Sequence, residues 1–228
     1  MNDFDPDALV VLQTPWFALN ATIAFTWIVM AVLAVGSMLV TRRLSTDATM
    51  SPMQNLLEVL VSGIEAQVLA VSRQAPGRYL PFVGTLFLFV AASNLLAVVP
   101  GWRAPTASLS TTTALALCVA FAVPLFTIAQ RGLRAWLRGY LQPSALMLPF
   151  NLIGEVSRTL ALAVRLYGNM MSGAVMAGIL LALTPFLFPV VMQLFGLLTG
   201  MVQAYIFAVL AMVYIASAAA STRGSSNG

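Results

Sequence analysis

Long runs of apolar residues cover most of the chain, and short polar stretches that contain Arg or Pro separate them. A helix needs about 20 apolar residues to cross the roughly 30 Å hydrocarbon core of a bilayer. Five segments reach that length, and we predict a membrane-spanning helix in each of them. They are residues 16–40, 79–99, 109–130, 144–184 and 186–221.

A further helix is predicted over residues 52–72, and its pattern is amphipathic. Pro52 can start this helix, and Glu58 and Glu65 share one face of it. A second face is apolar at helical spacing and consists of Leu56, Leu57, Leu60, Ile64 and Val68. We expect this helix to lie along the cytoplasmic surface of the membrane. An ordinary helix packed within a soluble loop remains the alternative.

The last two apolar segments are longer than a membrane crossing requires. Residues 144–221 are apolar apart from a break at Thr184, Pro185 and Pro189, whereas two ordinary spans need only about 40 residues. Helices of about 35 to 40 residues would each exceed about 50 Å. We therefore expect a hairpin of two long helices that tilt strongly or lie along a partner.

The composition excludes most other classes of protein. Hydrophobic residues make up 60% of the chain and charged residues 8%, whereas soluble domains are about one quarter charged. The high apolar content also excludes a disordered chain. Cys118 is the only cysteine and His is absent, which argues against a disulfide scaffold and against a zinc or haem site. The predicted fold class is an all-α polytopic membrane protein that forms a single membrane domain, 1–228.

The arginines predict the orientation of the chain in the membrane. All eleven basic residues are Arg, in short clusters between apolar runs, which is typical of cytoplasmic loops and not of a nucleic-acid-binding surface. The first 14 residues are acidic and are not a signal peptide. We therefore expect the N-terminus and Arg103 outside and the C-terminus inside. The cytoplasmic arginines would be Arg42, Arg43, Arg73, Arg78, Arg131, Arg134, Arg138 and Arg223.

One face of the segment 144–184 carries polar residues from Asn151 to Ser172. At about 100° per residue, these side chains fall within about 100° of arc and form a stripe about 30 Å long. A seam that joins helices, or an ion pair between Glu155 and Arg158, would be a structural explanation. The stripe consists of Asn151, Glu155, Arg158, Arg165, Asn169 and Ser172.

Neither structural explanation accounts for Arg165. No Asp or Glu follows Glu155 in the sequence, and an arginine side chain stays charged in proteins. Its counter-charge must come from water, a ligand or another protein. An ionisable residue inside a membrane span indicates a functional site, so Arg165 is the leading candidate. The last segment adds Gln203, an amide that needs a partner, and Tyr214.

Three motifs resemble subunit a of F-type ATP synthases. Arg165-Leu166-Tyr167-Gly168-Asn169-Met170 is similar to the family signature R-L-[FY]-G-N-M. Gln203-Ala204-Tyr205-Ile206-Phe207 is similar to the Q-A-[FY]-[IV]-F segment of the family's last helix. Asn94 to Pro100, followed by Pro105-Thr106-Ala107, resembles a family turn. The resemblance covers about residues 52–221, and the order of the elements agrees throughout.

The resemblance implies the stator half of a rotary motor. Its partners would be the rotor ring of c subunits, the b subunits of the peripheral stalk and the lipid bilayer, and it would transport H⁺ or Na⁺. Arg165 would face the rotor carboxylates, supported by Asn169, Ser172, Gln203 and Tyr214. Glu155, Arg158 and Asn151 would belong to the cytoplasmic half-channel. The outer half-channel would contain Ser108, Ser110, Thr111 and Thr112.

The chain also departs from the family pattern. Ala174 and Gly196 stand where the family often has ionisable side chains, and Ser108 stands where an Asp is common. The interval from Glu155 to Arg165 is about one helical turn shorter than usual. These departures resemble the N-type subgroup of bacterial rotary ATPases, in which sodium-binding rings are common.

We therefore interpret the chain as the ion-translocating subunit a in a bacterial plasma membrane. It would not be an enzyme by itself, since it has no nucleotide motif and no catalytic triad, and no cofactor or tightly bound metal is expected. The alternative is a self-contained secondary transporter or ion channel. Such proteins carry inverted repeats and internal carboxylates, whereas Glu155 is the only acid in the long helices.

Overall fold

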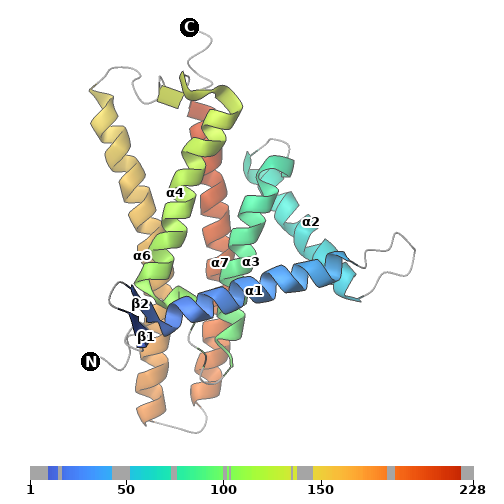
Figure 1. The fold of residues 1–228 in the computed structure, drawn as a ribbon, viewed down its shortest axis with the longest axis vertical. Coiled ribbons are helices and arrows are strands. Elements are labelled where there is room, and N and C mark those ends of the chain that lie inside the picture. Colours follow the sequence, from blue (N-terminus) through green and yellow to red (C-terminus); the bar gives the residue numbers. More distant parts are fainter. Residues whose placement is uncertain are drawn as a thin grey trace.

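The fold was analysed in a computed structural model, which describes residues 10–14, 17–42, 52–72, 76–99, 102, 104–134, 136–137, 146–183 and 188–221. The expected helical fold is confirmed (Figure 1). Its elements are β1 Val10–Thr14, β2 Phe17–Asn20, α1 Ala21–Thr41, α2 Pro52–Ser72, η3 Pro76–Arg78, α3 Leu80–Leu96, η4 Pro105–Ala107, α4 Leu109–Arg131, α6 Met147–Leu183 and α7 Phe188–Ser221. Several residues on which the predicted orientation and the predicted hairpin turn depend lie outside the described residues. They are Arg43, Arg73, Arg103, Arg138, Arg223, Thr184 and Pro185.

A small β-hairpin precedes the first helix, which the apolar pattern did not predict. The expected first span began near residue 16, but residues 17–20 pair with β1 and the helix starts at Ala21. The pairing is antiparallel, with Thr14 opposite Phe17 and Val10 opposite Asn20. A run of apolar residues specifies burial in an apolar medium, and short runs of this kind suit a strand as well as a helix.

Four of the described helices are long and apolar enough to cross a membrane. The qualifying stretches are Thr22–Leu39, Leu109–Gln130, Met147–Leu180 and Val190–Ala218. Helix α3 is also apolar but has only 17 residues, which is the lower limit for a span. Pro81 lies in its first turn, where the missing N–H costs no hydrogen bond.

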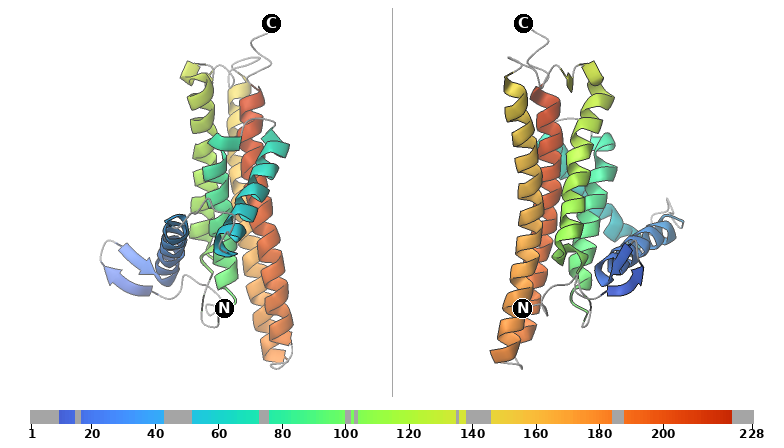
Figure 2. Two further views of the ribbon diagram at one scale, coloured as in Figure 1. Left: turned by 90° about the vertical axis from the view of Figure 1, so that its right-hand side faces the viewer. Right: turned by 60° about the vertical axis from the view of Figure 1, so that its left-hand side comes forward.

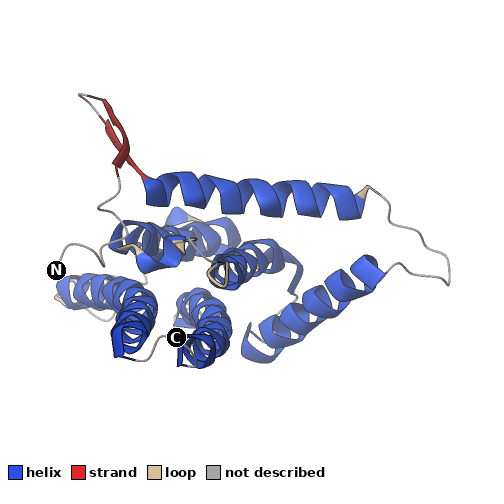
Figure 3. Cartoon of the chain, turned by 90° about the horizontal axis from the view of Figure 1, so that it is seen from below, coloured by secondary structure: helices blue, strands red, loops and turns tan. Residues whose placement is uncertain are grey.

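Helices α6 and α7 are the longest elements and lie side by side in both views of Figure 2. They contain 37 and 34 residues, which at about 1.5 Å per residue makes each about 50 to 55 Å long. Their hairpin end extends beyond the other helices. Helix α1 runs crosswise to the long helices and packs on the α3 and α4 side of the bundle (Figures 1 and 3).

Helix α7 forms the centre of the packing. Two clusters of buried apolar side chains meet on it. The first joins it to α1, α3, α4 and α6 and includes Val29, Phe89, Val90, Val119, Leu162, Leu166, Ala204, Phe207 and Ala211. The second joins it to α2, α3 and α4 and includes Val68, Tyr79, Val83, Val123, Ala208, Met212 and Ile215. Large apolar side chains such as Trp27, Phe121 and Leu125 remain exposed on the outer surface, which suits a lipid environment.

A buried amide fixes α7 against α3. The Nδ2 atom of Asn94 donates to the carbonyl oxygen of Gly200 at 2.7 Å, and the hydroxyl of Thr106 donates to Oδ1 of Asn94 at 3.0 Å. Both side chains are at least 97% buried. Gly200 permits this contact, because a Cβ atom there would lie 3.0 Å from Cβ of Asn94. One side chain thus links α3, η4 and α7.

Candidate functional site

The polar stripe of α6 lies along the flank of the helix, beside its buried face. Leu162, Ala163 and Leu166 are the buried side chains of this part of α6. At about 100° per residue, Arg165 is about 60° from Leu162 and about 100° from Leu166 around the helix. Its side chain is exposed. The structure therefore presents Arg165 outward at the edge of the bundle and does not bury it among the helices.

The remaining stripe residues are only partly covered. Arg158 and Ser172 are exposed, and Asn151, Glu155 and Asn169 are half-buried. Glu155 lies ten residues before Arg165, a separation of about 15 Å along the helix. No acidic residue follows in α6 or occurs in α7. Neither long helix therefore offers a carboxylate at the level of Arg165.

A cation–π contact defines how α6 and α7 are aligned. The guanidinium carbon of Arg158 lies 5.8 Å from the centroid of the Tyr214 ring. The helices are antiparallel, so counting residues from this pair places Phe207 opposite Arg165 and Gln203 opposite Asn169. Gln203 then lies about one helical turn, about 6 Å, from the level of Arg165. The sequence motifs that suggested a common site are thus neighbours in space.

Gln203 is the most deeply buried amide of α7. It is 5% exposed, and its Nε2 atom has no hydrogen-bond partner among the described residues. Its neighbour Ala204 belongs to the same buried cluster as Leu162 and Leu166 of α6. An unpaired buried amide costs about 1 to 3 kcal/mol. The structure therefore leaves a donor available between the long helices.

A cavity of about 330 Å³ lies between the second half of α6 and the first half of α7, against the segment that joins α3 to α4. We call it the α6–α7 cavity. Ala174 and Gly196, where the family often has ionisable side chains, both line it. Its polar lining consists of the side chains of Asn94, Trp102, Asn169, Gln193 and Thr199. Amides and hydroxyls of this kind hydrogen-bond water without adding charge.

Two further interactions hold the wall of this cavity. The Nε2 atom of Gln193 donates to the carbonyl oxygen of Val98 at 2.6 Å and ties the start of α7 to the end of α3. The hydroxyl of Thr199 donates to the carbonyl oxygen of Phe195 at 3.0 Å within α7. The indole Nε1 of Trp102 is buried without a hydrogen-bond partner among the described residues.

The hydroxyl cluster predicted for the outer half-channel does not line the α6–α7 cavity. Ser108 is 1% exposed and Thr112 is fully buried, whereas Ser110 is exposed and Thr111 half-buried on α4. The Thr112 hydroxyl donates to the carbonyl oxygen of Leu109 at 3.0 Å. Helix α4 and η4 both pack against α6, but from this part of the chain Ala104 and Ala107 line the cavity, and Ser108 and Thr112 do not.

Sequence reasoning missed Asn94, Trp102 and Gln193 as members of the site. The sequence could have identified Gln193 as a site residue, because it is an amide near the start of an apolar helix. Asn94 was recognised only as part of a motif. The described residues contain no group of three His, Cys, Asp or Glu side chains that could hold a metal ion. The site therefore combines a fixed cation, a neutral polar cavity and a buried amide.

Comparisons with known proteins agree on one family. The family model described as ATP synthase A chain matches residues 23–216. The chain is 59% identical over 213 residues to ATP synthase subunit a 2 of Acaryochloris marina, which covers 93% of this chain and 91% of the relative. It is 59% identical to ATP synthase subunit a of Albidiferax ferrireducens, over 96% and 94% of the two chains. It is 56% identical to ATP synthase subunit a 1 of Chlorobaculum parvum, over 93% and 94%. The protein therefore belongs to the ATP synthase A chain family, that of the membrane subunit a of ATP synthase.

Proposed function

We propose that this chain is the ion-translocating stator of a rotary ATP synthase and that Arg165 gates the carboxylates of the rotor. One observation carries the proposal: Arg165 is exposed on the flank of α6, and the chain has no acid after Glu155 that could neutralise it. A rotor carboxylate that passes this flank supplies the missing charge. The rotor ring of c subunits is therefore the partner for this face of α6.

The gating rests on the cost of burying charge. A carboxylate that has released its ion is expensive in hydrocarbon, while the neutralised form is not. Arg165 stabilises the empty carboxylate, because a guanidinium binds a carboxylate through two parallel hydrogen bonds. A rotor site then leaves Arg165 toward lipid only after it has taken up an ion. The ion must travel around the ring, since Arg165 separates the two access paths.

The α6–α7 cavity is proposed as the outer access path. It begins at Asn169, one helical turn from Arg165, and continues along Ala174 and Gly196 to Gln193 near the hairpin end. Its amide and hydroxyl oxygens suit water and hard cations such as sodium. The hydroxyl cluster of Ser108, Ser110, Thr111 and Thr112 would lie next to this path without lining it and would belong to the structure that supports it. The neutral lining is the departure that resembles the N-type subgroup, and the transported ion is H⁺ or Na⁺.

The inner access path is proposed at the other end of the stripe. Asn151, Glu155 and Arg158 occupy the first half of α6, and Tyr214 covers Arg158 from α7. Glu155 is the only carboxylate there, so it is positioned to attract cations from the cytoplasm. The two paths thus lie on opposite sides of Arg165 along the same helix.

The crosswise packing of α1 supports the expected tilt of the long helices. If α1 crosses the bilayer along its normal, α6 and α7 run obliquely, and their length of about 50 Å fits a bilayer of about 30 Å. The N-terminus would then be outside and the C-terminus in the cytoplasm of a bacterial cell. The chain would be a non-catalytic subunit that the b subunits of the peripheral stalk hold in place.

The decisive experiment replaces Arg165 in the complete complex. We expect Arg165→Ala to abolish ATP-driven ion pumping in reconstituted vesicles while the complex still assembles. Arg134→Ala is the matched control, because Arg134 is exposed but lies outside the polar stripe. Normal coupled pumping by Arg165→Ala would contradict the proposal. Ion flux through the isolated chain in vesicles, without a ring, would instead favour the self-contained transporter.

A further inference from the structure

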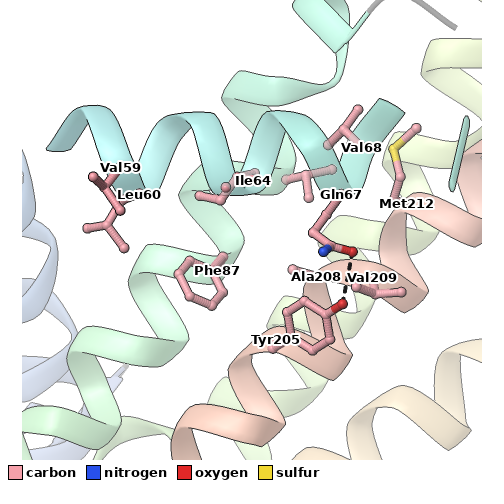
Figure 4. A pocket seen from close by; sticks show the side chains of 12 residues that line it. Val59, Leu60, Ile64, Gln67, Val68, Phe87, Tyr205, Ala208, Val209 and Met212 are labelled. Atoms are coloured by element: carbon pink, nitrogen blue, oxygen red, sulfur yellow. Dashed lines mark hydrogen bonds between the residues drawn. The ribbon is translucent and has the colours of Figure 1, made fainter. Parts of the chain in front are cut away.

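A second cavity, which the ion path does not use, lies on the far side of α7. It has a volume of about 290 Å³ and is formed by α2, α3 and α7 (Figure 4). We call it the α2 groove. Its lining is apolar apart from the side chains of Gln67 and Tyr205 and consists otherwise of Val59, Leu60, Gly63, Ile64, Val68, Val83, Phe87, Ala208, Val209 and Met212.

The lining argues against water as the occupant. A buried water needs two to four polar partners, whereas the groove offers one pair of polar side chains. These two bond to each other, since the Tyr205 hydroxyl donates to Oε1 of Gln67 at 2.9 Å. Figure 4 shows this bond beside Ala208 and Val209, with Leu60, Ile64 and Phe87 further along the groove. An apolar space of this kind is filled most favourably by hydrocarbon.

The amphipathic pattern of α2 places the groove toward the membrane. At about 100° per residue, its groove residues from Val59 to Val68 share one half of the helix, centred about 160° from Glu58 and Glu65. Both glutamates are exposed. A helix with this distribution lies in the interface with its charged face in water and its apolar face toward the acyl region. The groove therefore opens at the depth where lipid chains begin.

A positive charge lies in η3, an element that contacts two of the helices forming the groove. Arg78 is exposed in η3, which contacts both α2 and α3. Its neighbour Tyr79 belongs to the same buried cluster as Val68, Val83 and Met212, all three of which line the groove. The glutamates lie on the opposite face of α2. An anionic headgroup is therefore attracted to the Arg78 end and not to the middle of the helix.

We propose that the α2 groove binds one acyl chain of an anionic phospholipid, whose phosphate interacts with Arg78. The chain fills the apolar space beneath α2 and packs against Phe87, Ala208 and Met212. The lipid thereby acts as an apolar filler between α2 and α7, a pair of helices joined directly by the hydrogen bond of Gln67 and Tyr205. This site is separate from Arg165 and from the α6–α7 cavity.

Gly63 provides a substitution that fills the groove. A Cβ atom at Gly63 would meet no other atom within 4 Å, so a larger side chain there extends into free space. Gly36 of α1 has the same open surroundings but does not line the groove, and Gly36→Phe is therefore the matched control. Val59→Trp is a second filling variant, because Val59 lines the mouth and is 64% exposed.

The test uses the assembled complex in vesicles that contain phosphatidylglycerol with a photoreactive group on its acyl chain. We expect crosslinks on α2 and α7 residues of the groove. Gly63→Phe and Val59→Trp should reduce these crosslinks about tenfold, which is the loss of affinity expected if about two methylene groups of the acyl chain can no longer be buried. Gly36→Phe should leave the crosslinks unchanged. Crosslinking of the groove that persists in both filling variants would overturn the proposal, as would capture of a polypeptide in place of lipid.

A second arm tests the headgroup. Arg78→Gln should reduce labelling by the photoreactive phosphatidylglycerol about fivefold, the effect of about one basic residue near an anionic surface. Labelling by the phosphatidylcholine analogue should be weaker and insensitive to this change. Equal labelling by both lipids in the wild-type complex would refute the anionic specificity. The readout is lipid crosslinking, so it is independent of pumping and of the role of Arg165.

Discussion

The contact between Gly200 and Asn94 allows a quantitative test of the packing that supports the site. A Cβ atom at Gly200 would lie 3.0 Å from Cβ of Asn94 and 3.1 Å from its Cγ and Nδ2 atoms. Gly200→Ala must therefore displace the Asn94 side chain. We expect this movement to break the 2.7 Å bond to the Gly200 carbonyl and to disturb the 3.0 Å bond from Thr106.

The expected loss can be worked out from three contributions. Overpacking of a close contact costs about 1 to 3 kcal/mol, and the loss of a buried hydrogen bond costs about 1 kcal/mol. Replacing Gly by Ala within a helix raises the stability by about 1 kcal/mol, because Ala has the higher helix propensity. We therefore expect Gly200→Ala to lower the free energy of unfolding by about 1 to 3 kcal/mol.

Gly196 supplies the matched control, because it lies one turn earlier on the same helix. A Cβ atom at Gly196 would meet nothing within 4 Å, so Gly196→Ala should be neutral or stabilising by up to about 1 kcal/mol. The difference between the two variants isolates the contact with Asn94. It is measured by denaturation of the purified protein in detergent, followed by helical circular dichroism.

A double-mutant cycle completes the argument. Asn94→Ala removes two of the three atoms that would clash, Cγ and Nδ2, together with both hydrogen bonds, so Gly200→Ala should cost less in the Asn94→Ala background than in the wild type. A coupling of about 1 kcal/mol or more is expected for residues in direct contact. Equal stability of Gly196→Ala and Gly200→Ala, or strictly additive effects, would refute the reasoning.

Three further predictions concern the site and the orientation. Ala174→Leu should narrow the α6–α7 cavity and slow ATP-driven pumping several-fold, measured at varied sodium and pH. The triple variant Ser108→Ala, Ser110→Ala, Thr112→Val should slow pumping less than Ala174→Leu does. A larger effect of the triple variant would place the outer path along α4. Tyr214→Leu should remove the contact with Arg158 and lower stability in detergent by about 0.5 to 1 kcal/mol, while Tyr214→Phe keeps it; equal effects would exclude the cation–π contribution. In a Cys118→Ser background, Arg134→Cys should react with a membrane-impermeant maleimide only from the cytoplasmic side, and labelling from outside would contradict the proposed orientation.

The sequence predicted most of the helical fold, because the length of an apolar run and its period are local properties. It did not predict the β1–β2 hairpin or the crosswise course of α1. Strand pairing and helix crossing depend on which distant residues meet, and the apolar pattern of residues 16–40 is compatible with several arrangements. The buried link of Asn94, Thr106 and Gly200 was invisible for the same reason, since it joins residues up to 106 positions apart.

The difference between local sequence properties and contacts between distant residues also explains which features of the candidate site were predicted. The exposure of Arg165 was expected, because the absence of acids after Glu155 is a property of the sequence itself. The burial of Ser108 and Thr112 was not foreseeable, since the pattern of α4 does not reveal that this helix packs against η4 and α6. Hydroxyl groups in a membrane helix bond to their own backbone as readily as they line a water path.

The outward position of Arg165 has a consequence for biogenesis. An arginine at the centre of a membrane helix opposes insertion by about 3 kcal/mol, a factor of about 100 in the insertion equilibrium. Under the proposed function, a newly made chain would bear this penalty until a rotor carboxylate faces α6. Ordered assembly onto an existing ring would relieve it at once, while a chain synthesised in excess would insert poorly and become a substrate for quality-control proteases. Under the proposed function, the residue that gates the rotor would thus also make unassembled copies short-lived and would match stator production to the supply of rotors.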